Sequence, residues 1–156
     1  MARVAVTDGM DPEAIITLKK LGHDVVEQHY SKQELETGVL SEFDAVIIRS
    51  ATKITEKVIS KSGKLSFIGR GGVGVDNIDI DAATRANIVV CNTPRSSTHS
   101  VVELTIGHLL ASCRHIAKAD RSLRQKSWDK KILKGTELSG KRIGLIGFGR
   151  IAQGVA

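Results

Sequence analysis

The carboxyl-terminal stretch of the sequence constrains the possible folds most. Residues 142–146 form a short apolar run that is typical of a buried strand. Gly147, Gly149 and Ala152 follow with the spacing G-x-G-x-x-A, and Arg150 begins a run that resembles the first turn of a helix. A strand, a glycine turn and a helix start in this order form the entry to a dinucleotide-binding βαβ unit.

Each small residue of this motif has a physical role. Gly147 lets the backbone turn sharply, Gly149 leaves room for a pyrophosphate, and Ala152 allows close packing of helix and strand. The N–H groups of the first helical turn then face the anion. An ordinary βα turn gives the same pattern, and the acid that binds the ribose falls about 20 residues further on, past Ala156. We therefore expect the start of a Rossmann NAD-binding domain, opened but not completed.

The preceding chain alternates short apolar runs with helical segments. The expected strands are 3–7, a strand from Val25, 43–48, 65–68 and 88–91. The expected helix starts are Asp11 with Pro12, Ser31 with Glu34, Thr55, and Asp79 or Asp81. Such alternation predicts a parallel sheet with helices on both faces. We expect an α/β, flavodoxin-like, doubly wound lobe over residues 1–96, and a second part over residues 97–156.

Residues 101–126 are expected to form one long helix, opened by a capping box of Ser100 and Glu103. Its length would be about 39 Å at 1.5 Å per residue. The apolar stripe is wider than that of an ordinary amphipathic helix, so one lobe cannot bury it. We expect this helix to form a two-fold homodimer interface, followed by an irregular basic arm over residues 128–138.

A glycine-rich loop follows the fourth expected strand. Residues 69–74 contain four glycines, and such a loop can aim several N–H groups at one anion. Arg49 ends the third expected strand and Arg70 lies inside the loop. Ligands of open parallel sheets bind outside the carboxyl ends of the strands, so both arginines are candidate anion ligands. Two surface ion pairs are the alternative interpretation.

Composition excludes several other classes. The net charge is +6, but only one Trp and one Tyr are available for base stacking, so we expect no nucleic-acid partner. No apolar run reaches the ~18 residues of a membrane span. Cys91 and Cys113 have no metal-ligand spacing, so we expect no metal site and two reduced, buried thiols in a cytoplasmic protein.

Taken together, these motifs resemble those of the D-isomer-specific 2-hydroxyacid dehydrogenases. The matching stretches are Ile-Arg-Ser-Ala-Thr-Lys at 48–53, the glycine loop at 69–79, Asn-Thr-Pro at 92–94, Val-Glu-Leu-Thr at 102–105 and Gly-Phe-Gly-Arg-Ile-Ala at 147–152. They occur in the order found in the family and extend over the whole chain.

The resemblance implies a division of roles, with substrate bound by the first lobe and NAD by the second. By motif position, the substrate ligands are Arg49, Ser50, Arg70 and the amides of Gly71 and Gly72. The implied cofactor-binding residues are Val73, Gly147, Gly149, Arg150 and Ile151. The catalytic Arg, Glu and His of the family come from a later part of a longer chain, so we expect no catalytic residue within these 156 residues.

The implied reaction is hydride transfer from a small anionic 2-hydroxy acid to NAD, with 3-phosphoglycerate as the favoured substrate, in serine biosynthesis. Two alternatives stay open: a glyoxylate or hydroxypyruvate reductase, and a non-catalytic NAD-sensing corepressor of the same fold. We expect the 156-residue chain alone to be inactive, with weak or absent NAD affinity and a tail after Lys126 that is poorly ordered or packed against a partner.

Overall fold

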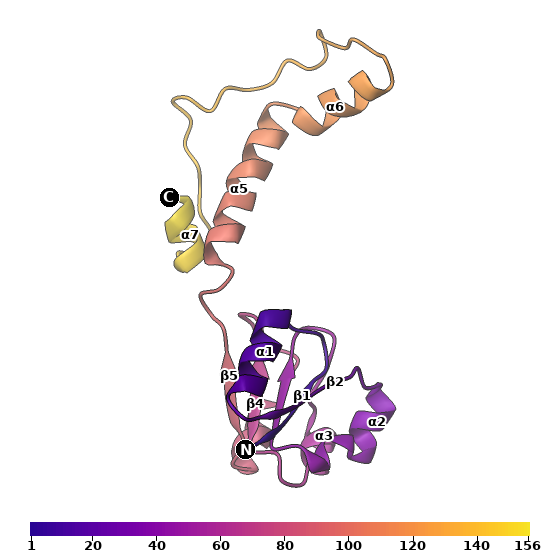
Figure 1. The fold of residues 1–156 in the computed structure, drawn as a ribbon. Helices are drawn as coiled ribbons and strands as arrows, with labels where there is room; N and C mark the ends of the chain where they lie inside the picture. The colour runs from indigo at the N-terminus through magenta and orange to yellow at the C-terminus, as the bar shows by residue number, and fades with distance from the viewer. The chain divides into compact units, whose positions relative to one another are not determined.

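The computed structural model describes residues 1–156, which form two compact units, Met1–Ser96 and Ser97–Ala156. The first unit contains a five-stranded parallel sheet with the order β2-β1-β3-β4-β5 (Figure 1). The strands are β1 (Arg3–Val6), β2 (Asp24–Glu27), β3 (Ala45–Ile48), β4 (Phe67–Arg70) and β5 (Val89–Asn92). This is the flavodoxin-like strand order, so the expected fold class is confirmed.

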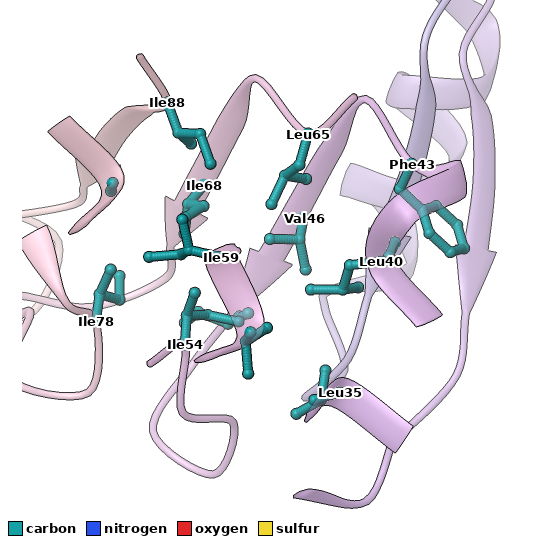
Figure 2. Close-up of a cluster of buried hydrophobic side chains, with 14 of the residues drawn as sticks. Leu35, Leu40, Phe43, Val46, Ile54, Ile59, Leu65, Ile68, Ile78 and Ile88 are labelled. Carbon is teal, nitrogen blue, oxygen red and sulfur yellow. The ribbon is translucent and has the colours of Figure 1, made fainter. Parts of the chain in front are cut away.

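Apolar side chains cover both faces of this sheet, as a doubly wound fold requires. On one face, α1 (Pro12–Lys20) packs through Ile15 against Val4 and Val6. On the other face lies the larger core, to which Leu40 and Ile68 belong (Figure 2). This second face is covered by α2 (Lys32–Thr37), the 3-10 helix η1 (Val39–Glu42), α3 (Glu56–Ile59) and α4 (Ile80–Arg85). The period of two along β3 explains the division, because Val46 belongs to one core and Ile47 packs on the other.

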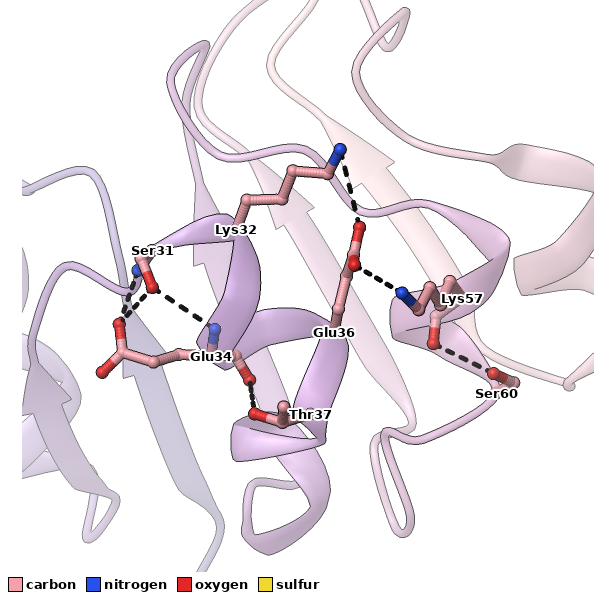
Figure 3. A network of polar contacts seen from close by, with 7 residues as sticks. All are labelled: Ser31, Lys32, Glu34, Glu36, Thr37, Lys57 and Ser60. Atoms are coloured by element: carbon pink, nitrogen blue, oxygen red, sulfur yellow. Dashed lines mark hydrogen bonds and ion pairs between the residues drawn. The ribbon is translucent and has the colours of Figure 1, made fainter.

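The helix starts at Asp11 and Ser31 follow the expected chemistry, whereas Thr55, also expected to cap a helix, precedes α3 without a side-chain cap hydrogen bond. The Asp11 carboxylate accepts from the Glu13 amide at 2.8 Å, and Pro12 occupies the first turn of α1. Ser31 and Glu34 form a complete capping box at the start of α2 (Figure 3). These side chains satisfy N–H groups that have no partner inside the helix.

Helix ends in this unit use left-handed residues. Gly38 ends α2 with φ 100°, and Asn87 follows α4 with φ 58°.

Asp79 is the N-cap of α4 and accepts from the Ala82 amide at 2.9 Å. Lys57 of α3 pairs with Glu36 of α2 at 2.6 Å, which links the two helices (Figure 3).

The second unit contains α5 (Thr98–Cys113), α6 (Ile116–Arg124) and α7 (Arg150–Val155). The expectation of one long helix over residues 101–126 was therefore wrong. The helix breaks at Arg114 and His115, and His115 has the left-handed φ of 55°. The arm contacts α5 at this break, where the Thr136 amide donates to the Cys113 carbonyl at 2.8 Å. Gly135 packs so close to the same carbonyl that a Cβ there would overlap it.

Two further expectations in this unit were wrong. Ser97, not Ser100, is the N-cap of α5, and no side chain caps that end. Residues 142–146 form no strand, because a parallel strand needs hydrogen-bonded neighbours and the second unit has no sheet. No regular helix or strand occurs between Gln125 and Gly149, so the irregular arm extends beyond residues 128–138.

Both cysteines are free thiols, but neither is buried as expected: Cys91 is exposed and Cys113 is partly exposed. Cys91 lies on β5, an edge strand that pairs on one side only, with β4. None of the helices has the length and hydrophobicity that crossing a bilayer requires.

Candidate functional site

The candidate site lies at the carboxyl edge of the sheet, where the strand order changes direction between β1 and β3. Chain connections leave these two strands in opposite directions, which opens a crevice at their ends. A cleft of about 560 Å³ opens there. It is lined by Asp8, Gly9, Met10, Asp11, Ile47, Arg49 and Gly71. The cleft therefore joins the β1–α1 loop to the ends of β3 and β4.

Arg49 and Arg70 are both without an acidic partner, although seven ion pairs form elsewhere in the chain. Arg49 is exposed and lines the cleft, whereas Arg70 is partly buried and does not line it. The Nε atom of Arg70 is buried without a hydrogen-bond partner. An unpaired buried donor is costly, so an acceptor from a ligand would relieve this cost. The alternative of two surface ion pairs does not occur in this structure.

Gly71 and Gly72 give the two arginine side chains room. A Cβ on Gly71 would lie 3.5 Å from Cγ of Arg49, which is an ordinary contact. A Cβ on Gly72 would overlap the guanidinium of Arg70. The glycine at residue 72 therefore leaves the space that the Arg70 head group occupies.

The glycine loop does not offer the amides that the sequence suggested. The Gly71 amide donates to the Ile48 carbonyl at 2.8 Å, and the Gly72 amide donates to the Arg70 carbonyl at 2.9 Å. The amides of Val73 and Gly74 donate to no protein acceptor. Asn92 holds this part of the loop, because its side chain donates to the Val73 carbonyl at 2.6 Å. The free N–H groups are thus displaced by two residues from the expected pair.

Sequence reasoning missed two polar residues of the site, Asp8 and Asn77. Both bond to the backbone of residues 49–52, and Asn77 is buried. Burial raises the pKa of Asp8, but hydrogen bonds from Thr52, the Arg49 amide and Thr7 outweigh this effect and leave the pKa below its usual value. Asp8 precedes a glycine in a turn and Asn77 lies in the glycine loop, so neither pattern signalled a contact with residues 49–52.

The nucleotide motif belongs to the second unit. Gly147 adopts φ 84°, which favours glycine, and Gly149 is the N-cap of α7. An added Cβ on Gly149 would meet no atom within 4 Å, so the backbone there is open to a ligand. Arg150 and Ile151 form the first turn of α7, and their amides donate to no protein acceptor. The chain contains no group of three or more His, Cys, Asp or Glu side chains that could hold a metal ion.

These features define a class: an α/β protein with a candidate ligand cleft at the switch point of a flavodoxin-like lobe, followed by a glycine motif of the kind that binds nucleotides. The sequence pattern of the D-isomer specific 2-hydroxyacid dehydrogenase, catalytic domain, matches residues 4–153. The chain belongs to this family.

Two curated relatives show how far the similarity reaches. The D-3-phosphoglycerate dehydrogenase of Methanocaldococcus jannaschii is 46% identical over 155 residues, which are 99% of this chain and 29% of that protein. The hydroxypyruvate reductase of Thermotoga maritima is also 46% identical over 155 residues, 99% of this chain and 50% of that protein. The chain therefore spans half or less of the length of these relatives, and identity does not separate the two activities.

Solved structures agree on the fold. A protein from Thermus thermophilus superimposes with a TM-score of 0.89 at 29% identity, over 98% of this chain and 51% of that chain. An NAD-dependent formate dehydrogenase from Staphylococcus aureus, in complex with NAD, gives 0.83 at 27% identity, covering 100% and 52%. An NADPH-dependent glyoxylate/hydroxypyruvate reductase from Sinorhizobium meliloti, in complex with NADP and malonate, gives 0.80 at 27% identity, covering 98% and 48%. Members of the family use NAD(H) or NADP(H), and their substrates are 2-hydroxy or 2-oxo acids.

Proposed function

We propose that this chain carries the substrate-binding lobe and the start of the cofactor-binding domain of an NAD-dependent D-3-phosphoglycerate dehydrogenase. The observation that carries the proposal is the pair of arginines at the carboxyl edge, Arg49 and Arg70, neither of which has an acidic partner in the protein. In an open parallel sheet this edge is where ligands bind.

The number of cationic groups supports 3-phosphoglycerate over a single carboxylic acid. This substrate has an anionic group at each end, a phosphate and a carboxylate. We propose that Arg49, which lines the cleft, binds one of these groups and that Arg70, at the end of β4, binds the other. Arginine binds both groups through paired N–H donors. The free amides of Val73 and Gly74 supply further donors for the carboxylate.

Hydroxypyruvate reduction is the second candidate. The Thermotoga maritima relative supports it, because its identity equals that of the Methanocaldococcus jannaschii relative. Hydroxypyruvate carries one carboxylate, and it would leave one of the two arginines without an anionic partner. The number of arginine contacts made by the bound ligand therefore discriminates between the candidates.

The residues of the second unit fit a dinucleotide. The backbone beside Gly149 is open, and the first turn of α7 has free N–H groups at Arg150 and Ile151 for a pyrophosphate. In the first unit, Val73 of the glycine loop exposes 41% of its surface, which suits contact with a nicotinamide ring. When bound, NAD supplies the acceptor for the hydride. The chain's own residues bind and orient the acid; the proton-accepting group is proposed to come from outside residues 1–156.

We also propose that α5 and α6 form a homodimer interface. They expose apolar side chains that the second unit does not cover: Leu104, Ile106, Leu110, Ile116 and Leu123. Exposed apolar groups on neighbouring helices mark an interaction surface. Residues 1–96 are then the substrate lobe, and residues 97–156 combine the dimer interface, the arm and the start of the NAD domain.

Calorimetric titration with 3-phosphoglycerate tests the proposed substrate. Arg49→Ala should weaken binding by about 10- to 150-fold, because a hydrogen bond to a charged group contributes about 1.5–3 kcal/mol. Lys53→Ala is the matched control: it removes a nearby exposed cation that does not line the cleft. Equal affinity of the Arg49→Ala variant and the unchanged chain would remove Arg49 from the site. Tighter binding of hydroxypyruvate than of 3-phosphoglycerate would favour the second candidate.

A further inference from the structure

We infer that Asp8 and Asn77 are positioning residues that hold the segment from Arg49 to Thr52 in the shape that presents the Arg49 side chain to the anion. The inference rests on the proposed function, since it concerns the same site. It starts from an apparent conflict: Asp8, a carboxylate, lines a cleft that is proposed to bind an anion. Its hydrogen bonds resolve the conflict.

The Asp8 carboxylate accepts four hydrogen bonds from the protein. Its Oδ2 atom accepts from the backbone amides of Arg49 at 2.7 Å and Thr52 at 3.0 Å. Its Oδ1 atom accepts from the hydroxyls of Thr52 at 2.5 Å and Thr7 at 3.2 Å. Hydrogen bonds to an ionised acceptor are shorter and stronger than neutral ones. The negative charge of Asp8 is therefore directed at the loop backbone.

Asn77 makes the complementary contacts. Its Nδ2 atom donates to the backbone carbonyls of Arg49 at 2.7 Å and Thr52 at 2.6 Å. The Oδ1 atom of Asn77 is buried and has no partner. Only the Nδ2 atom of Asn77 makes hydrogen bonds, which points to the two donated bonds as the role of this side chain.

Together the two side chains bond to the backbone N–H and the backbone carbonyl of the residue at each end of the segment. Arg49 and Thr52 each donate an N–H to Asp8 and each accept at their carbonyl from Asn77. Ser50 and Ala51 lie between these anchors and are exposed. Asp8 follows β1 and Asn77 follows β4, so the clamp joins three loops at the carboxyl edge of the sheet.

The polarity of the clamp gives it a signature. Asp8 must accept, and Asn77 must donate. In Asp8→Asn one oxygen stays for the two amides, and the new NH₂ can donate to the Thr52 hydroxyl, which can also accept. In Asn77→Asp a carboxylate of nearly the same shape faces two carbonyl oxygens. Asp8→Asn and Asn77→Asp each exchange one oxygen and one nitrogen atom, so their side-chain volumes hardly change. Their effects on binding should nevertheless differ, because only Asn77→Asp places an acceptor opposite two carbonyl oxygens.

The test compares four variants of the full 156-residue chain: Asp8→Asn, Asp8→Ala, Asn77→Asp and the control Thr7→Val. Thr7→Val removes a buried hydroxyl from the same network but leaves all four backbone bonds of the clamp. For each variant we would measure the Kd of 3-phosphoglycerate by calorimetry, the Tm, and amide hydrogen exchange at Arg49 and Thr52. The exchange of the Val46 amide, in the core, reports whether each variant is folded.

Affinity and stability should separate. We expect Thr7→Val to keep Kd within about threefold, Asp8→Asn to weaken binding less than Asn77→Asp does, and Asp8→Ala and Asn77→Asp to weaken it by about tenfold or more, the effect of about 1.4 kcal/mol. Thr7→Val should lower Tm without this loss of affinity. A Kd that follows Tm along one line through all variants overturns the inference, and so does wild-type affinity in Asn77→Asp. If Asp8→Ala does not fold, the contrast between Asp8→Asn and Asn77→Asp gives the same decision.

The exchange measurement needs no ligand, so it separates this inference from the proposed function. If the unchanged chain binds no 3-phosphoglycerate, the proposed substrate fails. The clamp then stands if the Arg49 and Thr52 amides are protected and lose protection in Asp8→Ala. It is overturned if these amides exchange as fast as that of Ser50, which donates to no protein acceptor.

Discussion

At the scale of single residues, the two arginines depend on their immediate neighbours. The Arg70 head group packs over Gly72, where no side chain is present to move it. Arg49 extends from a segment whose backbone is bonded to Asp8 and Asn77. Position in the sequence alone predicted that both arginines lie at strand ends, because apolar strands and the open-sheet rule place them there.

Replacement of Gly72 should affect binding more than folding. In Gly72→Ala the new methyl group overlaps the guanidinium of Arg70, a flexible group that can move away at little cost to stability. We expect 3-phosphoglycerate to bind several-fold more weakly, with Tm nearly unchanged. Gly144→Ala, in the second unit, is the control, since its methyl group would meet no atom within 4 Å. Equal affinities of the two variants would show that the location of Arg70 does not matter for binding.

The Asp8 carboxylate should give the protein a specific acid sensitivity. The pKa of Asp8 is lowered from 3.8 on folding, so its contribution to stability is complete above pH 3.8 and is lost as the pH falls through the folded-state pKa. The Tm difference between the unchanged chain and Asp8→Asn should therefore be largest near neutral pH and shrink below 3.8. Glu34, Glu36 and Asp44 also have lowered pKa values, but both proteins retain them and their effects cancel. A Tm difference that is independent of pH would contradict this role for the ionised carboxylate.

At the scale of elements, the sequence predicted those features that residues close together in the chain determine. Asp11 with Pro12 and Ser31 with Glu34 begin helices because their side chains bond to N–H groups a few residues away. The break at His115 has no such signal, and the residues that contact the end of α5 there, Gly135 and Thr136, are distant in the sequence. The clamp was missed for the same reason, because Asp8 and Thr52 are separated by 44 residues. Residues 142–146 were expected to form a strand but form none, because a strand requires neighbouring strands with which to pair.

Substitution of two glycines with positive φ measures how much one close backbone contact contributes to the loss of stability. Gly22 has φ 85° and open space around it, whereas Gly63 has φ 59° and a would-be Cβ lies 2.8 Å from the Ser41 carbonyl of η1. Gly22→Ala should cost about 1 kcal/mol for the left-handed backbone. Gly63→Ala should cost about 1–3 kcal/mol more, because it also overpacks a backbone contact. Denaturant unfolding measures both, and equal losses would mean that the Ser41 contact yields without cost.

At the scale of the whole molecule, the apolar faces of α5 and α6 lead to a prediction about assembly. Leu104 and Leu110 expose 58% and 42% of their surface on α5. We expect a dimer in analytical ultracentrifugation, and Leu110→Asp should shift it to monomer because the charge would be buried without a partner. The control is Lys118→Asp, at an exposed residue of α6. Thr105 is not used, because its hydroxyl donates to the Val101 carbonyl. A monomeric unchanged chain would contradict the proposed interface.

The central claim is that the carboxyl edge of the first unit binds an acidic 2-hydroxy acid. The most direct test is to titrate isotope-labelled chain with 3-phosphoglycerate and to follow the amide signals by NMR. The account predicts saturable shifts at Ser50, Val73 and Gly74, with the signals of α5 unchanged. Absence of shifts at saturating ligand, or shifts confined to residues 97–156, would contradict it.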